Sequence, residues 1–567
     1  MQLETVLCDR CQSKLTVEER TPSPPLQEMF RSTYKPSDVE ISQVNSLIES
    51  ANRDLERYDA EIRKVAETFL ILRKRRDDLL HYRDRCYSIV SSFRRIPAEI
   101  WTEVFLYTLG SRRGLLVTED FLVAPPVVLS QICSLWRNVA TLGSPELWSD
   151  LCLNVASNWP GVQHLVDLYL DRSKSAPLTL KVKAELNRTQ GKQGHVKWHK
   201  LCSWGQSVLK SLVGAGDRWR TASFEFHRDI LGEESIWKSS SCFPVNLESL
   251  VILFESEPSE ALTPLPNDFF SYASKLQSLE AAHFYTSNFH VKNLRKLKVH
   301  EQTADIFFLL DNCPHLQEID LPSSEGPESY TVSAPIVCNE LRSMTYNSCS
   351  SHTLAAIAEF ITFPSLTRLE LANCSDDSES RQAMFLSLRC LLQQSGCQLQ
   401  VLTLRMDVFA SDRQLVEILL LTPTVTDFGI YVDQYYGGIL TNNLLQTLSF
   451  TSDISPLLQG QTGVCLLPQM THFRLGFVEE VEGENPLPDP EGIFSVVNSR
   501  RTHSSAKHSR IVFFELRAQL CPASEKGQEW EKAFKSVERR LRALEKDGLD
   551  LDMEYRDIHS EEDEEES

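Results

Sequence analysis

Apolar side chains between residues 37 and 93 recur every seven residues. No glycine precedes Gly110, and no proline lies between Pro36 and Pro97, so nothing interrupts a helix there. Ser37 and Glu40 have the spacing of a capping box, which predicts the helix start. Two interleaved series contain thirteen apolar residues in fifteen positions: Ile41, Ile48, Leu55, Ile62, Phe69, Arg76, Arg83, Val90, and Val44, Ala51, Tyr58, Val65, Leu72, Leu79, Cys86. Charged residues fill the positions between, which is typical of a coiled-coil helix.

The coiled-coil pattern leaves the partner of this helix open. An isolated helix would expose its apolar seam to water, which favours a homodimer through residues 37–93. Arg76 and Arg83 interrupt the seam, however. A helix that folds back onto its own protein is therefore the alternative.

A compact segment with helical spacing follows, from residue 94 to residue 151. It opens with Ile96-Pro97-Ala98-Glu99-Ile100, where the proline suits a first helical turn, and continues with Val104-Phe105. We expect Ile100, Val104 and Phe105 to share one helical face. After a predicted loop, a second helical pattern contains Ile132-Cys133 and Trp136-Arg137, and Leu147-Trp148 closes the segment.

This order of residues resembles the F-box. Together with the long helix, the first 150 residues look like F-box proteins of mushroom-forming fungi, in which leucine-rich repeats follow. The sequence departs from the usual F-box pattern in two ways: Ile96 stands in place of the usual leucine, and residues 110–127 lengthen the middle of the motif. The resemblance implies binding to a Skp adaptor, and through it to a cullin scaffold. It assigns to that contact Ile96, Pro97, Ile100, Val104 and Phe105, with Glu99 and Arg137 at its polar rim. The remaining residues either extend this surface or form the small core behind it: Ile132, Cys133, Trp136, Leu147 and Trp148.

Segments with the spacing Leu-x-x-Leu-x-Leu recur in the second half of the chain. This spacing is the strand signature of leucine-rich repeats. The clearest cases begin at Leu247, Leu294, Leu316, Leu366 and Leu399, and looser ones begin at Leu276, Leu341, Val425, Leu445, Met470 and Ile511. Helix-like pieces lie between them, at 304–310 and 414–420. The pattern predicts an irregular strand–helix solenoid, with a packed α/β domain as the chief alternative.

These patterns together predict an α/β protein with a long coiled-coil helix, a small helical F-box, an irregular leucine-rich-repeat solenoid and an acidic tail. The expected divisions are a flexible segment over 1–36, the coiled coil over 37–93, the F-box over 94–151, a transition region over 152–244, repeats over 245–520, an amphipathic helix over 525–547 and a disordered acidic tail over 548–567.

Charge and cysteine content narrow the functional classes. The chain has 58 basic and 78 acidic residues, a net charge of −20, which argues against binding to nucleic acid or to anionic membranes. The start lacks a signal-peptide pattern, and no apolar run is long enough for a membrane span. Fifteen scattered cysteines indicate reduced thiols. We therefore expect a soluble intracellular protein, cytoplasmic or nuclear.

No residue pattern predicts catalysis, a metal or a cofactor. Cys8 and Cys11 have half of a zinc-binding spacing, but the next cysteine is Cys86, on the heptad seam. The residues by themselves indicate only a non-enzymatic interaction protein, and the resemblance to the F-box implies that it recruits an unidentified protein substrate to a Skp–cullin–F-box ubiquitin ligase. The alternative is a coiled-coil and repeat scaffold without a ligase role. A hydrolase or nucleotide-using enzyme within 245–520 has no supporting motif.

Overall fold

The chain divides into two compact units, Met1–Ile100 and Trp101–Ser567, in the computed structural model. The structure describes residues 2–8, 13–18, 23–31, 33, 35–110, 114–157, 159, 161–187, 193–238, 241–255, 268–284, 288–302, 306–322, 335–373, 378–405, 409, 411–433, 439–450, 465–479, 487–502, 509–521 and 524–557.

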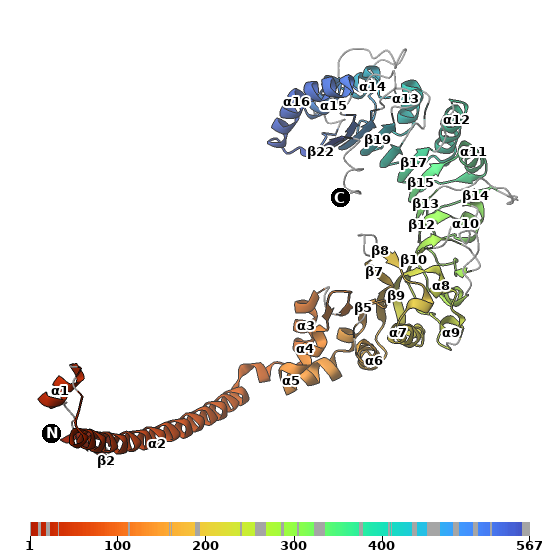
Figure 1. Ribbon diagram of the computed structural model, residues 1–567. Helices are drawn as coiled ribbons and strands as arrows, with labels where there is room; N and C mark the ends of the chain where they lie inside the picture. The colour runs from red at the N-terminus through yellow and green to blue at the C-terminus, as the bar shows by residue number, and fades with distance from the viewer. Residues whose placement is uncertain are drawn as a thin grey trace. The chain divides into compact units, whose positions relative to one another are not determined.

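The first unit is built around helix α2 (Asp38–Val90), which confirms the predicted long helix (Figure 1). The capping box forms as expected, because the Ser37 backbone N–H donates to the Glu40 carboxylate at 2.8 Å. The helix ends at Val90, and a short 3-10 turn over Ser92–Arg95 follows it.

Regular structure lies within the first 36 residues, where the sequence predicted a flexible segment. Strands β1 (Gln2–Cys8) and β2 (Ser13–Glu18) pair antiparallel, and helix α1 (Pro24–Arg31) follows. The β-branched residues Thr5, Val6, Thr16 and Val17 favour strands, a signal that the sequence prediction did not use.

The second unit contains one large, mostly parallel sheet. Among the described residues it has sixteen strands, and only β3 and β4 pair antiparallel. The strands follow one another across the sheet almost in chain order: β4 (Leu122–Val123), β3 (Leu115–Val117), β5 (Asp150–Asn154), β6 (Leu178–Lys183), β9 (Trp219–His227), β10 (Ser249–Glu255), β11 (Ser278–His283), β12 (Lys296–Gln302), β13 (Glu318–Leu321), β15 (Ser343–Cys349), β17 (Arg368–Asn373), β18 (Val401–Arg405), β19 (Asp427–Asp433), β20 (His472–Val478), β21 (Phe513–Leu520) and β22 (Asp550–Asp557).

The predicted strand positions are confirmed, and their apolar residues lie in register. The second apolar residue of each motif pairs with its counterpart on the next strand, and one such row runs through Leu250, Leu279, Leu297, Ile319, Met344, Leu369, Leu402, Phe428, Phe473 and Phe514. These side chains are buried, so each strand adds a layer to one continuous core. The exception is the motif at Leu445, which lies in helix α14 because a three-residue spacing also fits a helix.

Helices line one side of this sheet and lie in most of the connections between its strands (Figure 1). They include both predicted helical pieces, as α10 and α13. Their bounds are α6 (Val162–Arg172), α7 (Ser203–Val213), α8 (Arg228–Leu231), α9 (Glu234–Trp237), α10 (Ile306–Asn312), α11 (Ser351–Phe360), α12 (Ser378–Ser395), α13 (Asp412–Leu421), α14 (Asn442–Leu448), α15 (Pro490–Thr502) and α16 (Glu525–Glu545). Two smaller strand pairs are β7 (Glu185–Asn187) with β8 (Gln193–His195), and β14 (Ile336–Val337) with β16 (Ile361–Thr362).

The sheet extends beyond the predicted repeat region at both ends. The predicted loop over 110–127 contains β3 and β4, and the transition region over 152–244 supplies β6 and β9. At the other end, α16 confirms the predicted amphipathic helix, but β22 follows it and pairs with β21. Residues 550–557 therefore form a strand where a disordered tail was predicted, and residues 558–567 lie outside the described part.

Candidate interaction surfaces

An aromatic cluster forms the core of the segment that follows the long helix. It joins helix α3 (Ala98–Leu109) to helix α5 (Ser134–Asn138). The ring of Trp136 lies 5.3 Å from that of Trp101 and 4.9 Å from that of Phe105, measured between centroids. Trp101 and Phe105 are buried. Aromatic packing of this kind fixes how the two helices meet.

Trp148 ties this segment to helix α6. Its indole N–H donates to the carbonyl of Ala140 at 2.6 Å, and its ring packs edge-on against Tyr169 of α6 at 4.9 Å. Leu147 beside it is also fully buried. Burial raises the pKa of Tyr169 well above its ordinary value. Leu147 and Trp148 therefore belong to the core.

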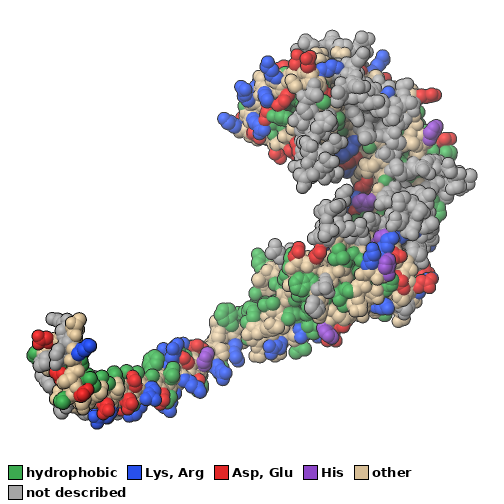
Figure 2. Space-filling view, viewed as in Figure 1, with side chains coloured by type: hydrophobic (Ala, Val, Ile, Leu, Met, Phe, Trp, Pro, Cys, Tyr) green, Lys and Arg blue, Asp and Glu red, His purple; other side chains and the backbone are tan. Residues whose placement is uncertain are grey.

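Apolar side chains are exposed on the same segment. Helix α4 (Pro125–Ile132) carries Val128 and Ile132, and α3 carries Val104 and Tyr107. Tyr107 is 91% exposed, and Leu142 near the end of the segment is 69% exposed. Hydrophobic side chains are visible at the surface over this part of the chain (Figure 2). We call Val104, Tyr107, Val128, Ile132 and Leu142 the α3/α4 surface.

The structure divides the twelve predicted adaptor-binding residues into three groups. Phe105, Leu147 and Trp148 are buried, Ile96 and Trp136 are half-buried, and Pro97, Glu99, Ile100, Val104, Ile132, Cys133 and Arg137 are exposed. Ile96, Pro97, Glu99 and Ile100 belong to the first unit. The expectation that Phe105 shares an accessible face with Val104 was wrong. Tyr107, Val128 and Leu142 were missed, although Tyr107 follows Val104 by three residues, which places both on one helical face.

Two of the exposed predicted residues have local structural roles. The Arg137 side chain donates from Nε to the carbonyl of Ser130 at 2.9 Å and so connects α5 to α4. The Cys133 Sγ accepts from the Trp136 backbone N–H at 3.4 Å, at the start of α5. Their presence in the motif therefore has a structural explanation that requires no partner.

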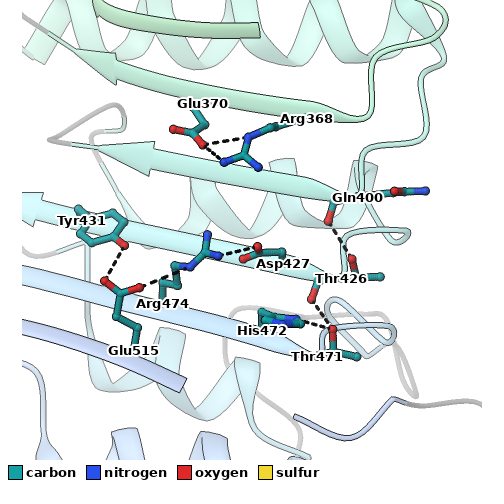
Figure 3. Close-up of polar contacts among 10 residues, drawn as sticks. All are labelled: Arg368, Glu370, Gln400, Thr426, Asp427, Tyr431, Thr471, His472, Arg474 and Glu515. Carbon is teal, nitrogen blue, oxygen red and sulfur yellow. Dashed lines mark hydrogen bonds and ion pairs between the residues drawn. The ribbon is translucent and has the colours of Figure 1, made fainter. Parts of the chain in front are cut away.

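A second candidate surface is the strand face opposite the helices. Arg474 of β20 lies between two carboxylates, 2.9 Å from Asp427 and 3.5 Å from Glu515 (Figure 3). Arg517 of β21 contacts Glu515 at 3.1 Å, Asp552 at 2.5 Å and Glu554 at 2.7 Å. These ion pairs link four neighbouring strands, β19 to β22, by charge as well as by backbone hydrogen bonds.

Tyr431 lies flat across this face, over positions that lack side chains. A Cβ atom at Gly476 would overlap the Tyr431 ring, and one at Gly429 would lie 3.4 Å from it. The Tyr431 hydroxyl donates to Glu515 at 3.4 Å (Figure 3), and the Arg405 guanidinium lies 5.1 Å from the ring centre. Burial, followed by the charge of Glu515, raises the pKa of Tyr431 to about 12, so the hydroxyl stays protonated.

A smaller charge cluster lies on β11 and β12. Glu280 accepts from Lys298 at 3.0 Å and contacts His300 at 2.7 Å. Burial by itself would raise the pKa of Glu280, but the hydrogen bonds from Lys298 and His300 outweigh it and lower that pKa. Burial dominates at the neighbouring Asp320 and raises its pKa.

Comparison with known proteins does not identify the chain. No model of a known protein family matches it, and no curated protein does.

The described residues do not assemble a metal or membrane site. No group of three or more His, Cys, Asp or Glu side chains among them is placed to hold a metal ion, and none of their helices is long and apolar enough to cross a membrane. Cys8 ends β1, and Cys11 lies outside the described residues. Cys313, Cys349 and Cys521 are buried thiols, as expected for small core residues, and burial raises the pKa of Cys313 to about 12.

Proposed function

We propose that this chain is a substrate-recognition subunit of a Skp–cullin–F-box ubiquitin ligase. Residues 94–151 act as the F-box and bind the Skp adaptor, and residues 245–520 act as leucine-rich repeats that bind the target protein. The observation that carries the proposal is the α3/α4 surface, which presents exposed apolar side chains in the segment whose sequence resembles the F-box.

The α3/α4 surface has the composition of a protein-binding site. Val104, Tyr107, Val128, Ile132 and Leu142 are exposed within about forty residues of chain. Grouped apolar side chains at a surface favour a partner that covers them. The aromatic cluster of Trp101, Phe105 and Trp136 holds α3 against α5, and Arg137 connects α5 to α4, so the helices that carry these side chains are preorganised for binding.

The repeat assignment is supported by the strand register and by the division of the sheet into two faces. Helices cover one face, and the opposite face carries polar and charged residues at alternate strand positions. Stacked repeats commonly bind proteins through such an extended strand face. A subunit of this kind contributes proximity between target and ubiquitin-charged enzyme, and needs no nucleophile of its own.

Direct binding to a purified Skp-family adaptor, measured by calorimetry with the full chain, tests the proposal. Val104→Asp with Ile132→Asp should weaken binding at least thirtyfold, because losing central apolar anchors costs about 2 kcal/mol or more. The matched control is Val512→Asp with Val337→Asp, since Val512 is 42% exposed like Val104, and Val337 is 56% exposed like Ile132. The control should bind as the unaltered chain does.

Two results would contradict the proposal. One is no adaptor binding by the unaltered chain, in which case the scaffold function without a ligase role is favoured. The other is equal loss of binding in both double variants, which would show that the substitutions act through general destabilisation. Circular dichroism of all three proteins checks that the fold is retained.

A further inference from the structure

The apolar seam of α2 is exposed along its length in the first unit. No residue of the helix is buried, and the first heptad series is 43–63% exposed at Ile41, Ile48, Leu55, Ile62 and Phe69. At the middle of the seam, Leu15 of β2 and the helix line an apolar cavity of about 500 Å³. The helix therefore has a continuous apolar face that its own unit leaves largely in water.

The two halves of α2 carry opposite charge. Residues 38–61 contain seven acidic and two basic residues, a net charge of −5. Residues 62–90 contain four acidic and eight basic residues, a net charge of +4. Two such helices attract each other when they run antiparallel and repel each other when they run parallel and in register.

We propose that α2 binds α2 of a second copy of this chain, antiparallel. In one register, residues whose numbers add up to 127 face each other, so seven of the eight positions of the first heptad series meet the seven positions of the second. The seven layers are Ile41 with Cys86, Ile48 with Leu79, Leu55 with Leu72, Ile62 with Val65, Phe69 with Tyr58, Arg76 with Ala51, and Arg83 with Val44. The overlap covers nearly the whole helix, and the charged halves face each other.

This register also explains the two arginines in the seam. Arg76 meets Ala51, whose small side chain leaves room for a guanidinium, and both arginines lie against the acidic half of the second copy. In a parallel dimer Arg76 would face Arg76, and Arg83 would face Arg83, inside the seam. Burying like charges against each other is strongly unfavourable.

The positions that flank the seam lead to the same orientation. Asp54 and Arg75 each precede a residue of the first series. In the antiparallel register, Asp54 of one copy and Arg75 of the other lie on the same edge of the seam and carry opposite charges. In a parallel pair, Asp54 would instead flank Asp59 of the second copy. Asp54 already lies 3.6 Å from Arg57 in its own helix, and that contact is compatible with either orientation.

The cavity near Leu15 lies where the symmetry axis of this dimer would pass. Its helix lining is Tyr58, Glu61, Ile62, Val65, Ala66 and Phe69, and the proposed layers at the centre are built from four of these residues. Side chains of the second copy would therefore enter an apolar space that the hairpin β1–β2 helps to enclose.

Sedimentation of the full chain tests self-association, and cross-linking tests the orientation. At tens of micromolar we expect a species of twice the 64.6 kDa chain mass. Cys86 is an exposed free thiol, so Ile41→Cys should give a cross-link between position 41 and Cys86 with a short bis-maleimide. Within one helix these positions lie roughly 68 Å apart, so the cross-link must join two copies. Adding Cys86→Ser should abolish it.

Charge reversal supplies an independent test of orientation. Asp54→Arg should weaken the dimer roughly threefold to tenfold. The symmetric dimer contains the pair of residues 54 and 75 twice, and the substitution places an arginine opposite Arg75 in both pairs. The matched control Asp59→Arg should change the affinity less, since Asp59 meets Ala66 in this register. A monomer at tens of micromolar, a cross-link between Cys86 and Cys86, or tighter association of both charge variants would overturn the proposal.

Discussion

At the scale of single residues, the structure separates side chains that the sequence motif grouped together. Val104 and Phe105 are neighbours in the motif, but successive residues of a helix point about 100° apart, so one is exposed and the other is buried. The sequence predicted that these residues matter without showing which of them form the core. That division depends on Trp136, whose contacts with Trp101 and Phe105 form only when α3 and α5 pack together.

The Tyr431 ring explains why position 476 lacks a side chain. We expect Gly476→Ala to lower the free energy of unfolding by about 1–3 kcal/mol, because the added methyl group displaces the ring. The control Gly143→Ala should be neutral or slightly stabilising, since its Cβ would have no neighbour closer than 3.9 Å. Denaturant unfolding of the full chain measures both. In a Tyr431→Ala background the cost of Gly476→Ala should nearly vanish, and a cost that persists would show that the ring is not its cause.

At the scale of elements, the sequence predicted those with strong periodicity and missed those whose stability comes from neighbouring strands. The α2 heptads and the capping box at Ser37 gave the long helix within a few residues. The motifs from Leu247 onward predicted the strand positions, because the spaced apolar residues of each motif are buried in the core. Strand β22 was missed because its acidic residues resemble a solvated tail, whereas Arg517 of β21 pairs with two of them.

Strand β22 is expected to stabilise the end of the sheet. Removing residues 548–567 would take away the partner of β21 along eight residues, the buried Leu549, and Tyr555, whose ring packs against Phe534 at 6.2 Å. We expect this truncation to lower the midpoint of thermal unfolding by several degrees, measured by calorimetry. The matched truncation of residues 558–567 removes six consecutive acids and should leave the midpoint unchanged, since exposed charges are screened. Equal midpoints for the two truncations would contradict a structural role for β22.

At the scale of the whole molecule, the two proposed binding surfaces of the second unit lie far apart. Ten strand-to-strand steps separate β3, which lies between α3 and α4 in the chain, from β18, which carries Arg405, and this path along the sheet is roughly 48 Å. The α3/α4 surface is apolar, whereas the strand face around Tyr431 is charged. Substitutions at such separated sites usually act independently. The sequence indicated two binding regions, but their chemical difference became visible only with the side chains in place.

Independent surfaces predict that adaptor binding and target binding can be lost separately. Arg405→Glu with Tyr431→Ala changes the strand face and should reduce recovery of target proteins while leaving the adaptor bound. Val104→Asp with Ile132→Asp should do the opposite. Affinity purification of each full-length variant followed by quantitative mass spectrometry measures both partners in one experiment. The contrast requires that the sheet between the two sites keeps one conformation, because a shared conformational change would couple them. Parallel loss of adaptor and targets in both variants would therefore show that the second unit binds its partners through a single coupled site.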